Sequence, residues 1–499
     1  MLNAIIEPLE RHWPAALLVL VGCLVPLWIG QITNEPINSD GRTNARMAVN
    51  LVHHGVISRD EDVATAPTMY REPLPAVSAA LGVLIADGIL GRASTPEYLR
   101  GERGRYLKFH HVPWKAAAVV GTYALILLLS SSHIAALIGA ALIGTRPDLD
   151  TLNTELEAGA LLVIGLALFV AGHRRANHAL IAAAGVAFGL VALTKAAFLY
   201  VFIGFVAIVP FVFESRNVRS AGFALPAAGY GARLRGVGRS LPTVAILVAA
   251  FAAVTLPWMV RNYMHFGAFE ISGRAGIVLY TRAMKNQMTA EEYWGSFYAW
   301  SPRRVRGIVG RLMGFDESDL ALGGPLQRFN RAEDSELAPL DEAAELSGRP
   351  EAALTFYRAA RAERVRLVEQ YSTTLPPEAA ERAADDELKT RALRAFAAAP
   401  LKHLAMSIPF TWRGAGLFVP VLAAAFVLAW RRSDRAMLLV ALTASGYIVL
   451  HALLTHFEGR FAAPLKPLIL AVGVVVAAEV GKALLVRSGA ARLVRQAQV

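Results

Sequence analysis

The sequence predicts an all-α protein that crosses a membrane many times, and three observations carry this prediction. Hydrophobic residues make up 55% of the 499 residues and charged residues only 18%, whereas about a quarter of the residues of a soluble protein are charged. Apolar runs of roughly 18 to 22 residues, long enough to cross a bilayer core as a helix, recur along most of the chain. The short segments between them are rich in arginine, which is typical of cytoplasmic loops.

The apolar runs divide the chain into about ten expected spans. The first run has no small-residue cleavage signal, so we expect a retained span rather than a signal peptide. The ten ranges are 13–33, 114–131, 133–145, 158–172, 178–193, 197–213, 241–258, 415–430, 436–454 and 466–485.

The arginine-rich segments predict the orientation of these spans. Four of them, at 174–175, 214–240, 431–435 and 482–495, fall on one side of the membrane with this set of spans. The positive-inside rule assigns that side to the cytoplasm, together with both termini. The net charge of +11 therefore follows from topology and does not indicate nucleic-acid binding.

The apolar stretch 71–91 is the one segment that conflicts with this count. If it crossed the membrane, every later span would reverse and the arginine loops would lie outside. We therefore expect a helix in or on the outer face, within a first external loop at about 34–113. This loop is basic, and binding of a phosphate or an anionic lipid would explain its charge.

The longest polar segment, at 259–400, is predicted to be an external, mainly helical cap. It follows an N-terminal transmembrane module at 1–258 and precedes C-terminal transmembrane helices at 401–499. Its Glu–Arg run at 350–385 is expected to be a solvated helix face rather than a binding patch.

Asp40 is the first candidate for chemistry, because it follows the first span directly in "INSD". One interpretation is that Ser39 or Asp40 only caps the following helix. The other is that Asp40 is a general base held near the membrane surface, with its pKa raised by partial burial. Ala45, Ala48 and the pair 51–52 form an apolar stripe at helical spacing, which predicts a helix along the membrane face.

The order of motifs resembles the GT-C membrane glycosyltransferases, the group that includes protein O-mannosyltransferases and the aminoarabinose transferase of lipid A. Asp40, Ala48, Leu51 and Gly55, followed by "YREPLP" at 70–75, are similar to the first external loop of that group. The further matching segments are "TLNTELEAG" (151–159), "GLVALTKAAF" (189–198), "LPWMVRNYMHFGAFEISGRAGIVLY" (256–280) and "HFEGRFAAPLKP" (456–467).

The resemblance implies a GT-C-like bundle of about ten transmembrane helices in a bacterial inner membrane, with juxtamembrane helices in the first external loop and a small periplasmic cap. It also implies transfer of a sugar, with inversion, from a polyprenyl-phosphate donor to a glycan, lipid or protein acceptor. Asp40 would be the general base, and Glu155 would assist as a second acid or position the acceptor.

The cationic residues at external span ends are candidates to bind the donor phosphate and to stabilise the charge of the leaving group. The ordinary alternative for each is an interfacial anchor, which is how we interpret Arg413. The candidates are Arg460, Lys195, Arg261, Arg71 and Lys466, supported by Glu458, Tyr70 and Glu72.

The sequence leaves open whether the protein binds a divalent metal. Gly41 stands where many relatives have a glutamate, and Asn44 stands where they have an aromatic residue. A hard-cation or zinc site could still form by tertiary contact, although loop residues without a ligand are the simpler interpretation. The candidate ligands are Asp148, Asp150, His53 and His54.

Two other classes of function compete with a glycosyltransferase. A transporter or flippase for a lipid-linked or anionic substrate would also place charges at span ends, although such proteins tend to have repeats and ionisable groups at the midplane. An assembly scaffold would not need Asp40. Cys23 is the only cysteine, so neither a disulfide framework nor a thiolate metal cluster is expected.

Overall fold

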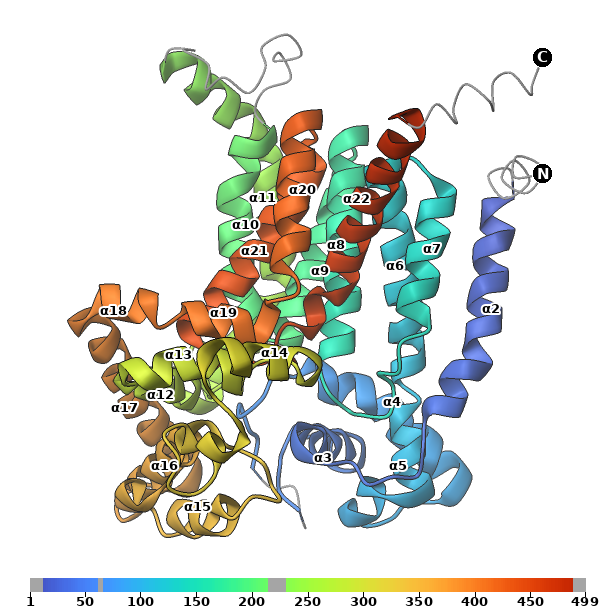
Figure 1. Cartoon of the computed structure of the whole chain (residues 1–499). Helices are drawn as coiled ribbons and strands as arrows, with labels where there is room; N and C mark the ends of the chain where they lie inside the picture. Colours follow the sequence, from blue (N-terminus) through green and yellow to red (C-terminus); the bar gives the residue numbers. More distant parts are fainter. Residues whose placement is uncertain (1–11, 62–65, 214–229, 488–499) are drawn as a thin grey trace, which may run out of the picture.

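In the computed structural model, residues 12–61, 66–213 and 230–487 are described, and their secondary structure is helical without strands. Upright helices form a bundle, and the cap and the first loop lie together at one end of it (Figure 1). The bundle consists of α2 (Trp13–Gln31), α6 (His111–Ser130), α7 (His133–Gly144), α8 (Glu155–Arg175), α9 (His178–Thr194), α10 (Ala197–Phe213), α11 (Tyr230–Phe266), α20 (Val419–Arg432), α21 (Arg435–Leu454) and α22 (Lys466–Arg487).

These helices confirm a multi-pass membrane protein. Six helices of the described chain are long and apolar enough to cross a membrane, and α20 with the bent segment before it gives a seventh. The helices α7, α9 and α10 are shorter but apolar. Each predicted span coincides with one of the upright helices. The bend of 95° before α20 was not predicted.

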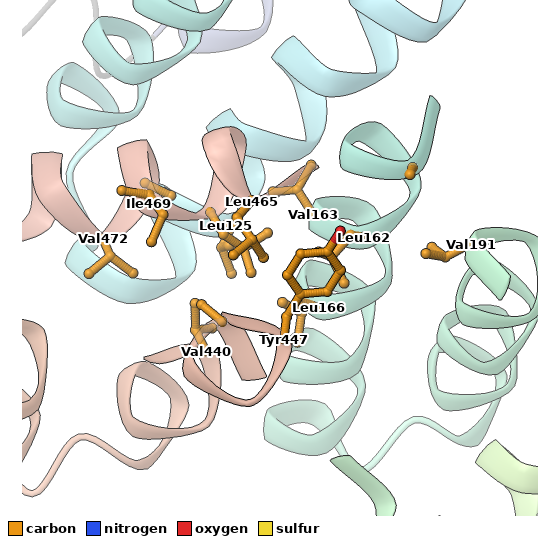
Figure 2. Close-up of a cluster of buried hydrophobic side chains, with 14 of the residues drawn as sticks. Leu125, Leu162, Val163, Leu166, Val191, Val440, Tyr447, Leu465, Ile469 and Val472 are labelled. Atoms are coloured by element: carbon orange, nitrogen blue, oxygen red, sulfur yellow. The ribbon is translucent and has the colours of Figure 1, made fainter. Parts of the chain in front are cut away.

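The core of the bundle is built around α8. Leu162, Val163 and Leu166 of this helix pack against Leu125 of α6 and Tyr447 of α21 (Figure 2). Small residues allow the neighbouring helices to approach closely, as is usual for membrane helices. At Gly185 of α9, for example, a Cβ atom would lie 2.5 Å from the carbonyl oxygen of Leu247 on α11.

The first external loop folds into helices that lie beyond the ends of the upright helices (Figure 1): α3 (Ser39–His54), α4 (Leu74–Leu90) and α5 (Gly101–Lys108). One side of α4 is buried against α3 and α5 through Ala79 and Val83, whereas Leu81 and Leu84 on the other side are exposed. An apolar exposed face suits a helix that lies in the membrane surface. The exposed apolar face of α4 is the feature that the placement expected for residues 71–91 requires.

The cap is helical, as predicted. It consists of α12 (Ala275–Met284), α13 (Ala290–Ala299), α14 (Arg303–Met313), α15 (Leu337–Leu346), α16 (Phe356–Ser372) and α17 (Pro377–Ala398), and it leads through α18 (Pro400–Ala405) and α19 (Ile408–Ala415) into α20. The expected boundary at residue 258 falls inside α11, which continues through Pro257 to Phe266. The buried Arg282 joins the cap to the bundle by donating to the carbonyl of Ala452 at 3.1 Å.

Two of the predicted cytoplasmic arginine segments, 174–175 and 431–432, lie at the end of the bundle opposite the cap. The helix α8 starts at the cap end with Glu155 and finishes with Arg174 and Arg175. At the same far end α20 finishes with Arg431 and Arg432. The start of α2 and the end of α22 also lie there (Figure 1). Most of the predicted basic segment 214–240 and the residues beyond 487 are outside the described side chains.

The close packing of α9 on α11 gives a stability prediction. We expect Gly185→Val to lower the free energy of unfolding by about 1 to 3 kcal/mol, because the added side chain has to push α11 away. The matched control is Gly204→Val on α10, where a Cβ atom would meet nothing within 4 Å. Thermal unfolding of the purified protein in detergent measures both, and equal melting temperatures for the two variants would contradict the packing.

Candidate active site

A cavity of about 1040 Å³ lies where the first loop, the cap and the cap-side ends of the bundle helices meet. Segments far apart in the sequence contribute polar side chains to it. One part of its wall is apolar and comes from the ends of α10 and α11 and the following segment, with Leu199, Tyr200, Met259 and Phe269. The polar lining includes Asp40, Tyr70, Arg71, Glu72, Glu155, Lys195, Arg274, Arg331, Tyr357, Arg358, Arg361, His451, Glu458 and Arg460.

Asp40 lies in the first turn of α3 and faces this cavity. Asn44 donates to the carbonyl of Leu152 at 3.0 Å, and a Cβ atom at Gly41 would lie 3.0 Å from Leu152 Cβ, so α3 rests on the second external loop. The N-cap residue of α3 is Asn38. The interpretation of Asp40 as a helix cap is therefore wrong.

The carboxylate of Asp40 is surrounded by arginines. Arg71 Nη2 donates to Oδ1, and Arg460 Nη1 lies 3.4 Å from Oδ2. Burial raises the pKa of Asp40, but the charges of Arg71, Arg274 and Arg460 outweigh it and hold the pKa below the ordinary 3.8. The expectation of a raised pKa is wrong, because the sequence did not show how many guanidinium groups converge here.

Arg274 is a site residue that the sequence analysis missed. Its guanidinium lies over the ring of Tyr70, 4.9 Å from the centroid, and its buried Nε has no hydrogen-bond partner. Among the described residues it has neither a hydrogen bond nor an ion pair, although its charge acts on Asp40. Arg71 also keeps a buried Nε without a partner. Two cationic side chains with unused donors give this part of the cavity the chemistry that suits an anion.

Tyr70 lies between several guanidinium groups. The guanidinium of Arg59 also lies over its ring, 4.7 Å from the centroid, as does that of Arg274. Burial raises the pKa of Tyr70, but the charges of Arg274, Arg364 and Arg71 outweigh it and lower the pKa below 10.0. The predicted supporting role of Tyr70 therefore takes the form of a ring that holds cations in place.

Glu72, Glu155 and Lys195 line the cavity beside the arginines. Glu72 Oε1 accepts from the backbone N–H of Ala196 at 3.0 Å, which fixes the turn between α9 and α10. Lys195 at the end of α9 donates to Glu155 at 2.7 Å. The structure thus brings these three predicted residues together with Asp40.

Glu458 gathers three arginines beside the Asp40 cluster. It pairs with Arg331 of the cap, with Arg413 at 3.2 Å and with Arg460 at 3.6 Å. Burial raises the pKa of Glu458, but Arg413, His456 and the other arginines outweigh it and lower the pKa to about 2. Arg413 is only 15% exposed, so its interpretation as an interfacial anchor is wrong.

Two of the predicted phosphate-binding residues do not line the cavity. Arg261 donates to the carbonyl of Thr68 at 3.0 Å and lies over the ring of Trp258. It supports the segment that leads to Tyr70 and Arg71. Lys466 begins α22 and is partly buried outside the cavity.

The cap contributes more to the cavity than expected. Tyr357, Arg358 and Arg361 of α16 belong to its lining, so the prediction of a purely solvated face at 350–385 is wrong for these residues. Both arginines pair with Glu345 of α15 at 2.5 Å. Arg331 stacks on Tyr357 at 3.7 Å and joins α16 to the Glu458 cluster.

The four candidate metal ligands do not converge. His53 pairs with Asp87 at 2.8 Å, and His54 is exposed. Asp148 pairs with Lys115 at 2.5 Å and Asp150 with Lys108 at 2.9 Å. His53, Asp148 and Asp150 are each paired with a different side chain and tie segments of the chain together. The four candidates therefore do not form one metal site.

Comparison with solved structures identifies the fold. The Archaeoglobus fulgidus oligosaccharyltransferase in its apo form matches 97% of this chain with 52% of its own length, at a TM-score of 0.50 and 14% identity. The chain has the GT-C fold. The same enzyme tethered with an acceptor peptide containing the NVT sequon matches 96% of this chain with 51% of its own, also at 0.50 and 14%.

The chain therefore spans about half the length of the archaeal enzyme. ArnT from Cupriavidus metallidurans, bound to undecaprenyl phosphate, matches 94% of this chain with 78% of its own, at a TM-score of 0.37 and 14% identity. No protein-family profile matches the chain, and no curated protein sequence matches it. The predicted all-α, GT-C-like fold is confirmed.

The Glu458 cluster gives a stability prediction. Glu458→Gln leaves Arg331, Arg413 and Arg460 together without their carboxylate, so we expect the free energy of unfolding at neutral pH to fall by about 3 kcal/mol. Added sulfate should restore part of the loss by binding among the arginines. Because the folded pKa of about 2 lies below the ordinary 4.5, the wild type keeps this contribution above pH 4.5 and loses it as the pH falls toward 2.

The control for this prediction is Glu317→Gln, which removes an exposed partner of Arg306. It should change the free energy of unfolding by less than about 0.5 kcal/mol. Thermal unfolding of both variants with and without sulfate measures the difference, and a Glu458→Gln protein as stable as the control would contradict the role of the cluster.

Proposed function

We propose that the chain is a GT-C glycosyltransferase that moves a sugar from a polyprenyl-phosphate donor to an acceptor hydroxyl at the outer membrane surface. One observation carries the proposal: in a single cavity at the end of the bundle, the carboxylate of Asp40 lies among Arg71, Arg274 and Arg460. A phosphate and a proton acceptor are the two groups that such a transfer needs side by side.

In this reaction the acceptor oxygen attacks the anomeric carbon while the bond from that carbon to the phosphate oxygen breaks. The acceptor proton passes to Asp40, and the polyprenyl phosphate leaves with the bonding electrons. Arg71, Arg274 and Arg460 stabilise the charge that develops on the leaving oxygen. A single displacement of this kind inverts the anomeric configuration of the sugar.

The lowered pKa of Asp40 gives the donor a second role. When no phosphate is bound, the charges of the three arginines lower the pKa of Asp40, and Asp40 is then a weak base. A bound phosphate neutralises part of that charge, so the pKa of Asp40 rises when the donor occupies the site. The base then becomes effective only after the donor has bound.

Lys195 and Glu155 complete the site. Lys195 is 14% exposed and is within reach of a phosphate in the same cavity, and its pairing with Glu155 sets the position of both. Glu155 then assists as a second acid or holds the acceptor. The acceptor itself is a glycan, a lipid or a protein.

The membrane orientation supports a site on the external face. The arginines in the short loops after α8 and α20, at 174–175 and 431–432, lie at the end of the bundle opposite the cavity, and the positive-inside rule assigns arginine-rich short loops to the cytoplasm. In a bacterial inner membrane the cavity then opens toward the periplasm. The ionisable lining residues belong to helix ends and to the cap, whereas a transporter would hold its substrate near the midplane.

Asp40→Asn tests the role of the base. We expect transfer to fall by about 10²- to 10⁴-fold, with the donor still bound, because the amide cannot accept the proton. Membranes supplied with radiolabelled polyprenyl-phosphate sugars measure transfer, and donor retention on the purified variant measures binding. Glu61→Gln, a 57% exposed carboxylate of the same loop, is the control. Full transfer by Asp40→Asn would exclude the mechanism.

Arg274→Gln tests the anion site. We expect kcat/KM for the donor to fall by about 10²-fold, because the variant removes one of the positive charges that stabilise the leaving phosphate. The variant also removes one of the charges that lower the pKa of Asp40, so the acid limb of the kcat/KM profile should move from below 3.8 to higher pH. Arg394→Gln, an exposed arginine of α17, should change neither quantity. An unchanged profile in Arg274→Gln would contradict the assignment.

A further inference from the structure

Three ionisable side chains converge in the interior beside the candidate active site but outside its cavity. His110 and His111 lie where α5 leads into α6, and Glu157 lies in the first turn of α8. Their exposures are 4%, 1% and 1%, and the nitrogen or oxygen atoms that each can offer lie within 4.8 Å of one another.

The hydrogen bonds of His110 determine which ring nitrogen carries the proton. Its Nδ1 lies 2.6 Å from the carbonyl oxygen of Leu107, which can only accept, so Nδ1 carries the hydrogen. In the neutral ring the other nitrogen, Nε2, is then an acceptor, and it lies 3.1 Å from Glu157 Oε1. Two acceptors in contact repel each other unless a proton or a cation lies between them.

A proton shared by His110 and Glu157 would satisfy only one of the oxygens. The second oxygen of Glu157, Oε2, is buried and has no hydrogen-bond partner. An unpaired carboxylate oxygen in the interior is costly. The ring of His111 lies 4.2 Å from that of His110 between centroids, and its Nδ1 makes only a long contact of 3.5 Å with the carbonyl of Leu149.

We propose that His110, His111 and Glu157 bind a divalent transition metal, with zinc as the best match. Two imidazole nitrogens and one carboxylate are a ligand set that zinc favours, and a water molecule would complete four ligands. A bound cation satisfies both oxygens of Glu157 and the Nε2 of His110 at once. The contact of the His110 Nδ1–H with a backbone carbonyl is the outer interaction that fixes a metal-binding histidine.

This site is linked to Asp40 by a series of backbone contacts. It joins the first external loop, at the start of α6, to α8, and His111 contacts Leu149 of the second external loop. Leu152 of the same loop accepts from Asn44 and packs on Gly41, next to Asp40. The metal would therefore stabilise the two loops that support α3. This role does not depend on the reaction proposed above.

The test uses the full-length protein, purified in detergent without chelators. Elemental analysis should find about one zinc ion per chain, and removal by a strong chelator should lower the melting temperature, which added Zn²⁺ then restores. Glu157→Gln and His111→Gln should bind Zn²⁺ at least about 100-fold more weakly. His53→Gln is the matched control, because it alters another histidine–carboxylate pair, that of His53 with Asp87.

Zinc absent from the wild type, with no thermal response to added Zn²⁺, would overturn the proposal. So would full zinc content in Glu157→Gln and His111→Gln, or equal loss in His53→Gln. Should the ligand variants fail to fold, Co²⁺ substituted into the wild type decides the question. Absorption bands of a four- or five-coordinate ion support the site, and the spectrum of octahedral aqueous Co²⁺ contradicts it.

Discussion

The concentration of guanidinium groups around one carboxylate is the constraint on which the rest of this structure depends. Arg71, Arg274 and Arg460 repel one another, and Arg71 is almost completely buried. Asp40 alone does not neutralise three positive charges, so the surrounding structure has to hold them together. It does so with aromatic rings such as that of Tyr70 and with a second carboxylate, Glu458, that pairs with Arg460. The resulting positive field is available to an incoming anion.

The scaffold around this cluster is a set of ties between segments far apart in sequence. Lys108 and Lys115 hold Asp150 and Asp148, and the second external loop that carries these acids supports α3. The buried Arg282 joins the cap to the bundle, and Arg331 joins it to the segment before α22. Each tie is short and directional, so the positions of the side chains that line the cavity are fixed by the loops and the cap as well as by the bundle helices.

Hydropathy was sufficient to predict the apolar helices of the bundle, because a helix in lipid has to be apolar over its full length. Asp40, Glu155, Lys195 and Arg460 were named as candidates because they stand in motifs at span ends, and all four line the cavity. Arg274 was missed although it lies in the same quoted segment as Arg261, since the chain alone does not show which of two arginines faces a cavity. The pKa of Asp40 and the pairing of His110 with Glu157 depend on tertiary contacts, which spacing along the sequence does not encode.

The apolar wall formed by Leu199, Tyr200, Met259 and Phe269 has a consequence for how a lipid-linked molecule meets this protein. For the donor proposed above, this wall would let the head group reach the arginines while the hydrocarbon chain stays in the bilayer. Encounter would then be diffusion in two dimensions, and the membrane rather than the protein would supply most of the affinity for the tail.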